Sequence, residues 1–362
     1  MIIAISVTFF FLILRFTVTL FNFISNPKLH RVAKAYDDKV SILIPARDEE
    51  CNILNLLRSI DAQDYENYEV IILDDSSSDH TYKVCADFAA NHPRFKIIKG
   101  EELPPDWLGK NYACHQLAKQ ANGDFLLFLD ADEKIYDGLI NSAVHRMYLR
   151  KLSLLSLFAN QDMRSVGELT VVPLMHYILL TLLPVQLVYL IKNYTVAAAS
   201  GQFMLFDAAT YHENQWHQQA KDEVVEDVSI MKLVKANKYN GEALLANNMV
   251  SCRMYKTYIE AINGFSKNFL AAFNYSVMGF LIYIVLVIGG PMMIMMTLNF
   301  PMIFLMVGLI ILMRIMISLA AKQSAFYNIA LHPVQMFNLT LVAFVAIQKH
   351  LTKTNVWKGR RI

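Results

Sequence analysis

Charged residues are scarce in this 362-residue chain: they make up 18% of it, against about 25% in ordinary soluble proteins. Hydrophobic residues make up 55% and gather at the two ends, whereas residues 37–165 have the composition of a soluble protein. The formal net charge is only +2, so a general role in binding polyanions such as nucleic acid has no support. The length suits one large domain or one domain with membrane segments.

Cysteines are few and show no spacing typical of metal ligands: Cys51, Cys85, Cys114 and Cys252. We interpret them as reduced cytosolic thiols that behave as small apolar side chains. Internal repeats, low-complexity tracts and long linkers are also absent from the sequence.

The first apolar run covers residues 2–24, and Arg15 is its one charge. A membrane span needs about 20 apolar residues, so residues 1–26 are expected to form an N-terminal transmembrane anchor. A signal peptide is the alternative, but the run is too long for one and lacks a basic start and a cleavage site. Basic residues follow closely and place the next part of the chain in the cytoplasm by the positive-inside rule: Lys28, His30, Arg31, Lys34 and Lys39.

The C-terminal third contains three further apolar runs, at 269–298, 300–319 and 329–347. We assign residues 269–348 to membrane segments and 349–362 to a basic tail. Because the tail also favours the cytoplasm, the crossings after the catalytic region must be even in number. The last run carries polar residues in its first half, so we predict that 329–347 lies at the interface and only two runs cross. Arg314 lies deep in the second run. A charged residue at such a position suggests a function, but the sequence does not show which one.

Strand and helix patterns alternate over residues 40–160. Strands that are apolar throughout and alternate with helices indicate a parallel sheet covered on both faces, with ligands at the carboxyl ends of the strands. The expected strands are Val40–Pro45, Tyr68–Leu73, Phe95–Ile98 and Asp124–Leu129, and the expected helices are Glu50–Ile60, Tyr82–Ala90 and Tyr112–Ala121. The run 171–191 contains Pro173 and Pro184, which favours an interfacial or core helix over a span.

Acidic residues follow two of these strands. Asp74 and Asp75 could accept hydrogen bonds from a nucleobase or a ribose, although Ser78 and Asp79 could merely cap the next helix. Asp130 and Asp132, two residues apart at a strand end, could both reach one Mg²⁺ or Mn²⁺ ion, which prefers oxygen ligands. The competing interpretation is a solvated acidic turn.

A third acidic pair, Glu226 and Asp227, opens an apolar-faced helix. Acidic side chains suit a helix start electrostatically. They could equally supply a general base that deprotonates an acceptor hydroxyl.

These motifs resemble, in order and spacing, those of family 2 glycosyltransferases over about residues 38–268. The resemblance implies an α/β nucleotide-diphospho-sugar transferase (GT-A) fold with a parallel-rich mixed sheet, and inversion at the anomeric carbon. It implies that the nucleoside is held by Pro45, Arg47, Glu49 and Asp74 or Asp75. Asp130 and Asp132 would bind the diphosphate directly or through metal, and Asp227 would be the base with Glu226 beside it.

A closer resemblance is to the bacterial carotenoid (diaponeurosporenoate) glycosyltransferases. The segments that carry it are Trp107–Gln116, Arg253–Tyr255, Gly264–Asn268 and Trp357–Arg360. It implies a diphosphate contact for Lys110 and an acceptor-side loop at Gly201 and Gln202. Lys110 could otherwise be a surface lysine, and Gly201 a plain turn.

The sequence departs from the processive members of the family, which carry Gln-X-X-Arg-Trp after the base. Here the stretch is Ser251–Tyr255, which lacks that motif. Arg253 within it is a candidate acceptor-side residue whose role stays open. We therefore expect a multi-pass membrane enzyme that moves one sugar from a nucleotide-sugar, with UDP as the expected nucleotide, to a terpenoid-like lipid. The alternatives are a membrane polysaccharide synthase, a polyprenyl-phosphate glycosyltransferase, an inactive binding protein, and a transporter. Arg314 alone supports the last of these only thinly.

Overall fold

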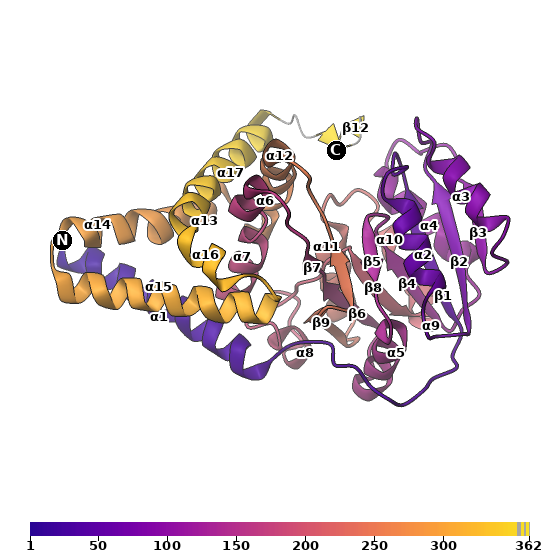
Figure 1. The fold of residues 1–362 in the computed structure, drawn as a ribbon, viewed down its shortest axis with the longest axis horizontal. Helices are drawn as coiled ribbons and strands as arrows, with labels where there is room; N and C mark the ends of the chain where they lie inside the picture. Colours follow the sequence, from indigo (N-terminus) through magenta and orange to yellow (C-terminus); the bar gives the residue numbers. More distant parts are fainter. Residues whose placement is uncertain (353–355, 358–359, 362) are drawn as a thin grey trace. The chain divides into compact units, whose positions relative to one another are not determined.

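The computed structural model describes residues 1–352, 356–357 and 360–361 and contains two compact units (Figure 1). The α/β unit comprises Pro27–Asn160 and Gln186–Arg253, and the helical unit comprises Met1–Asn26, Gln161–Val185 and Met254–Arg361. Each unit is described by itself below.

The α/β unit is built on a seven-stranded sheet of order β3-β2-β1-β4-β8-β6-β9. Strands β1 to β4 run parallel, β8 runs antiparallel to both β4 and β6, and β6 and β9 are parallel. The strands are β1 (Val40–Ala46), β2 (Tyr68–Asp74), β3 (Phe95–Lys99), β4 (Phe125–Leu129), β6 (Leu154–Phe158), β8 (Phe203–Asp207) and β9 (Gly241–Leu245). The predicted parallel-rich mixed sheet is confirmed.

The central strands are buried along nearly their whole length. Every side chain of β4 is buried, and so is every side chain of β1 except Pro45. Apolar side chains on both faces require cover on both faces, which accounts for the alternation of strand and helix. The helices of this unit are α2 (Ile53–Asp61), α3 (Thr81–Ala89), α4 (Gly109–Gln120), α5 (Leu139–Arg150), α8 (Leu187–Leu190), α9 (Ala208–Asn214), α10 (Trp216–Gln219) and α11 (Glu226–Ala236).

Two short strands beside the main sheet bring distant parts of the chain together. β5 (Glu133–Ile135) pairs antiparallel with β10 (Val250–Cys252), with Glu133 opposite Cys252. A further strand, β7 (Asn160–Gln161), lies where the chain passes from one unit to the other.

The outer edge of β9 is covered by the residues that follow the N-terminal helix. The Leu245 amide donates to the Pro27 carbonyl at 2.8 Å, and the Leu29 amide donates to the Leu245 carbonyl at 3.0 Å. Lys28 thereby forms a parallel bridge with Leu245.

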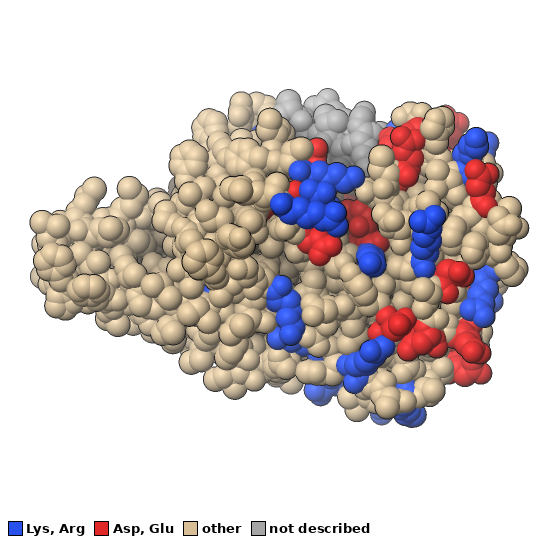
Figure 2. Space-filling view, viewed as in Figure 1, with Lys and Arg blue, Asp and Glu red and all other residues tan. Residues whose placement is uncertain are grey.

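The helical unit contains three helices that are long and apolar enough to cross a membrane: α1 (Ile2–Ser25), the helix over Val277–Met296, and α15 (Phe300–Ala321). The second of these consists of α13 (Val277–Ile284), a π-helical turn (Val285–Gly289) and α14 (Gly290–Met296), so Gly289-Gly290-Pro291 does not end it. Asn299 caps α15, whose first turn holds Pro301. On the face shown in Figure 2, the surface of this unit is almost free of charged side chains.

The remaining helices of this unit are α6 (Val166–Val171), α7 (Leu174–Leu182), α12 (Tyr258–Asn268), a short 3₁₀ turn (Ala271–Phe273), α16 (Ala325–Ala330) and α17 (His332–Thr352). The apolar run 171–191 is divided at Pro184 between α7 and α8 and does not form one helix. Lys353 and Lys358 of the basic tail lie outside the described residues, and β11 (Val356–Trp357) pairs with β12 (Arg360–Arg361).

Candidate active site

Two loops at the carboxyl ends of β1 and β2 are fastened to each other. Arg47 donates through Nη1 to the carbonyl of Asp75 at 2.7 Å. Asp48, held at a positive φ of 51°, accepts from the Ser78 amide at 2.7 Å. These bonds fix the loop backbones before any ligand arrives.

The residues predicted to hold a nucleoside lie at the carboxyl ends of β1 and β2 or on the loops that follow these strands. Asp74 and Asp75 are 7% and 8% exposed, at the end of β2. Pro45 lies opposite Leu73 in the parallel pairing of β1 and β2, and Glu49 directly follows the Arg47 turn. The loops thus bring all of these candidates to one edge of the sheet.

Lys110 lies at the centre of an ionic cluster next to that edge. It projects from the first turn of α4, and its Nζ is 2.7 Å from Oδ1 of Asp130 and 3.0 Å from Oε1 of Glu226. Burial alone would lower the pKa of Lys110, but the two carboxylates outweigh it and hold that pKa well above its ordinary value. Lys110 is therefore a fixed positive charge, not a surface lysine.

Asp227, the predicted base, is held by two backbone amides. Gly201 donates to its Oδ2 and Val228 to its Oδ1, both at 2.8 Å. Burial and the neighbouring Glu226 carboxylate raise the pKa of Asp227 to about 7, against the opposing effect of Lys110. Lys110 instead lowers the pKa of Glu226, outweighing the effect of burial. Two adjacent carboxyl groups thus have pKa values shifted in opposite directions, a pattern typical of acid–base sites.

Gly201 is needed at its position because the cluster leaves no room for a side chain. A Cβ atom there would lie 2.9 Å from Nζ of Lys110 and 3.3 Å from Oε1 of Glu226. The next residue, Gln202, is buried and directly precedes β8. The predicted acceptor-side loop therefore adjoins the predicted base.

A second acidic cluster lies beyond the end of β4. Ligand atoms of Asp132, Glu133 and Cys252 all lie within 4.8 Å of one another. The Cys252 thiol donates to Oδ2 of Asp132 at 3.4 Å. Burial raises the pKa of Asp132 to about 6, with contributions from Asp130 and Glu49, and raises that of Glu133 well above its ordinary value.

This second cluster fits a divalent cation. Glu133 is 1% exposed, and neither of its carboxylate oxygens has a cationic partner among the described residues. Two carboxylates without a nearby cationic partner are the hard oxygen donors that Mg²⁺ and Mn²⁺ prefer. Asp130, predicted as a second metal ligand with Asp132, is bound to Lys110 in this structure.

Three residues in and around the site were given no role from the sequence: Glu133, Cys252 and Asn111. Glu133 directly follows Asp132, which was a usable signal, whereas the strand pairing that brings Cys252 to it has no local signal in the sequence. Asn111 donates to the carbonyls of Ala220 and Glu223 at 2.7 and 3.0 Å and so ties α4 to the loop before α11. Arg253, a predicted acceptor-side residue, directly follows β10 and is the last residue of the segment Gln186–Arg253 of the α/β unit.

A mainly parallel sheet with carboxylates at the ends of β2 and β4, and a fixed lysine paired with the carboxylate after β4, defines a fold of the nucleotide-diphospho-sugar transferase class. A solved mannosyltransferase from Pyrobaculum calidifontis, in complex with GDP-Man and Mn²⁺, has this fold. The similarity covers 97% of this chain and 100% of that one, with a TM-score of 0.58 and 15% identity. At 15% sequence identity, this similarity establishes the fold alone.

Within that class, residues 41–207 match the sequence model of Glycosyl transferase family 2. A 4,4'-diaponeurosporenoate glycosyltransferase of Staphylococcus haemolyticus is 25% identical over 237 residues, which are 63% of this chain and 60% of that protein. A beta-monoglucosyldiacylglycerol synthase of Trichormus variabilis is 32% identical over 103 residues, 28% of this chain and 22% of that protein. The resemblance to family 2 and the GT-A fold predicted from the sequence are confirmed.

Proposed function

We propose that the protein is a membrane-bound inverting glycosyltransferase that moves one sugar from a nucleotide-sugar to a lipid acceptor. The observation that carries this proposal is the cluster around Lys110, in which a fixed cation lies beside Glu226 and next to a carboxyl group, Asp227, with a pKa of about 7. Lys110 is within the residues that match the family 2 model, and Asp227 follows them in the chain. Lys110 and Asp227 can both act in one reaction, a displacement at the anomeric carbon of the donor sugar.

The donor would lie along the carboxyl edge of the sheet. Its nucleoside would contact the loops that contain Arg47, Asp74 and Asp75, and its diphosphate would lie beside Lys110. Asp132 and Glu133, with Cys252 nearby, would hold Mg²⁺ or Mn²⁺, and the related mannosyltransferase was solved with Mn²⁺. A bound cation would supply charge neutralisation for the leaving diphosphate.

The transfer step is a single displacement. Oxygen of the acceptor hydroxyl forms a bond to the anomeric carbon, and the bond from that carbon to the diphosphate oxygen breaks. Asp227 accepts the hydroxyl proton, and the Lys110 ammonium stabilises the negative charge that develops on the leaving diphosphate. Gly201 holds the Asp227 carboxylate in place through its backbone amide. An acceptor that is itself a carboxylate would already be ionised and would need little help from the base.

A lipid acceptor is supported by the three apolar helices and by the printed names of the relatives, which act on a carotenoid acid and on a diacylglycerol lipid. We propose a terpenoid-like acceptor because the longest match is to the carotenoid enzyme. The basic residues after α1 favour catalysis on the cytoplasmic face.

The experiment is product analysis by mass spectrometry. Membranes that contain the protein are incubated with UDP-sugars and GDP-sugars and with terpenoid, diacylglycerol or polyprenyl-phosphate lipids. We expect one lipid class to gain the mass of a single sugar, and Asp227→Asn membranes provide the control. A ladder of products would favour a polysaccharide synthase, and labelling of polyprenyl phosphate would favour a polyprenyl-phosphate glycosyltransferase.

A further inference from the structure

Two arginines lie buried among the apolar helices of the helical unit. Arg15 is the only charged residue of α1, and Arg314 is the only charged residue of α15. They are 3% and 1% exposed. Both lie well inside their helices, away from the ends where a long side chain could reach water.

The two guanidinium groups converge on one aromatic ring. The Cζ atoms of Arg15 and Arg314 lie 4.9 and 4.4 Å from the ring centroid of Tyr177, on α7. Arg15 also donates a long hydrogen bond of 3.4 Å to the hydroxyl of Thr181 on the same helix. Three segments far apart in the sequence thus bring two positive charges together.

No carboxylate of this unit compensates these charges. Its sequence contains three acidic residues, Asp162, Glu168 and Glu260. Glu168 and Glu260 accept hydrogen bonds at the starts of α6 and α12, and Asp162 is exposed. An uncompensated buried charge in apolar surroundings is costly, and a ring face offsets only part of that cost.

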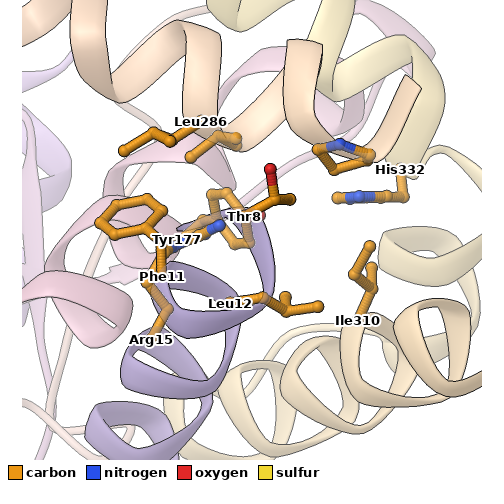
Figure 3. Close-up of a pocket in the computed structure, with 10 residues that line it drawn as sticks. Thr8, Phe11, Leu12, Arg15, Tyr177, Leu286, Ile310 and His332 are labelled. Carbon is orange, nitrogen blue, oxygen red and sulfur yellow. The ribbon is translucent and has the colours of Figure 1, made fainter. Parts of the chain in front are cut away.

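Donor atoms of both arginines have no acceptor among the described residues. These atoms are Nε of Arg15 and Nε and Nη2 of Arg314. Nδ1 of His332 also has no hydrogen-bond partner in the described part of the chain, and His332 lines a cavity of about 10 Å³ together with Arg15 and Tyr177 (Figure 3). That volume is about the minimum for one water-sized group, so an anion would place a single oxygen atom there.

We propose that Arg15 and Arg314 form a binding site for the phosphate group of an anionic phospholipid. The planar guanidinium group matches phosphate oxygens and can donate two hydrogen bonds at once. Among helices that can cross a membrane, lipid headgroups are the anions nearest at hand. Because both arginines lie inside their helices, the bound headgroup lies deeper in the membrane than the headgroups of the surrounding lipids. It therefore exchanges slowly with those lipids. The site is separate from the transfer reaction.

The test uses the full-length protein, purified in neutral detergent and mixed with phosphatidylglycerol or phosphatidylcholine. Retained lipid is counted by native mass spectrometry, and the unfolding temperature is measured in parallel. We expect selective retention of phosphatidylglycerol and a higher unfolding temperature with it. Arg15→Gln and Arg314→Gln should each weaken retention on the order of 10-fold to 100-fold, as loss of charge-assisted hydrogen bonds does.

Lys322→Gln is the matched control, because Lys322 is an exposed cation just after α15, and it should retain the lipid. Arg314→Lys, which keeps the charge but loses the planar fork, should retain an intermediate amount. Equal retention of the two lipids by the unaltered protein would overturn the proposal, whether or not the variants fold. Inorganic phosphate that stabilises as well as the lipid would overturn the lipid assignment. Loss of folding of the glutamine variants in neutral detergent would instead make the arginines structural partners of Tyr177 and also overturn the proposal.

Discussion

The backbone amide of Gly201 donates a 2.8 Å hydrogen bond to Oδ2 of Asp227. The same glycine faces Lys110 so closely that any side chain would displace the lysine or Glu226. One small residue therefore governs the position of both the proposed base and the proposed diphosphate contact.

Gly201→Ala should reduce turnover on the order of 10²-fold, the scale expected when a catalytic group shifts by about 1 Å. The fold should persist, because the clash falls on the end of the flexible Lys110 side chain. The control is Gly308→Ala, where a Cβ atom meets nothing within 4 Å. That change should leave activity intact and, as an alanine in a helix, stabilise by about 0.5–1 kcal/mol. Equal activity of the two variants would show that Gly201 does not position the site.

Asp227→Asn should lower turnover by about 10²–10⁴-fold, the usual contribution of a general base. Asparagine has nearly the same volume, so donor binding should change little. Nucleotide-sugar affinity measured by calorimetry beside steady-state rates separates the two effects. A loss of affinity as large as the loss of rate would move Asp227 to the donor site.

Transfer to a hydroxyl acceptor should depend on pH through the ionisation of Asp227. Burial and Glu226 raise the pKa of Asp227 to about 7, and Lys110 only partly opposes them. The base acts when ionised, so kcat/KM should rise with pH up to about 7 and level off above it. A profile that is already flat below pH 7 with a hydroxyl acceptor would contradict this role.

Chelation with EDTA should abolish transfer, and Mg²⁺ or Mn²⁺ should restore it. Asp132→Ala should fold, since Asp132 is only partly buried, yet no cation should restore its activity. Cys252→Ser replaces a soft donor by a hard one, so Mg²⁺ should still activate that variant. Full activity of the unaltered protein in EDTA would remove the metal from the scheme.

The sequence also predicts that α1 and two C-terminal helices cross the membrane, with residues 329–347 at the interface and the tail inside. The helix over those residues, α17, is not among the helices that satisfy the criteria of length and apolar composition. A cysteine at position 355, outside the described residues, should react with an impermeant reagent only after cells are opened. Reaction in intact cells would make α17 a third C-terminal span.

Local patterns were sufficient to predict the strands that carry the site. β1, β2 and β4 are mainly apolar runs, and acidic residues stand at the end of β2 and directly after β4. Mainly apolar strands that alternate with helices are typical of a parallel sheet buried on both faces. Asp74, Asp130 and Asp132 could be placed at one sheet edge for that reason. The importance of Lys110, in contrast, came only from the family resemblance, because its partner Glu226 lies more than a hundred residues later.

Contacts between distant segments had no such signal. Cys252 reaches Glu133 through a pairing of two three-residue strands, too short to show a pattern. Arg15 and Arg314 each interrupt an apolar run, but their convergence on Tyr177 depends on how three helices pack. The sequence shows where a proline could interrupt a helix, but it does not show whether the helix ends there. Pro184 separates two helices, whereas Pro291 lies inside a continuous one.

The backbone pairing of residues 27–29 with β9 has a practical consequence for aggregation. An open edge strand is a template for pairing with another copy of the chain, and this segment fills that position on β9. A shortened chain that begins at Val40, the natural choice for a protein without its first apolar helix, would expose that edge. A shortened chain that begins at Pro27 keeps the edge covered and should aggregate less in detergent than the chain that begins at Val40.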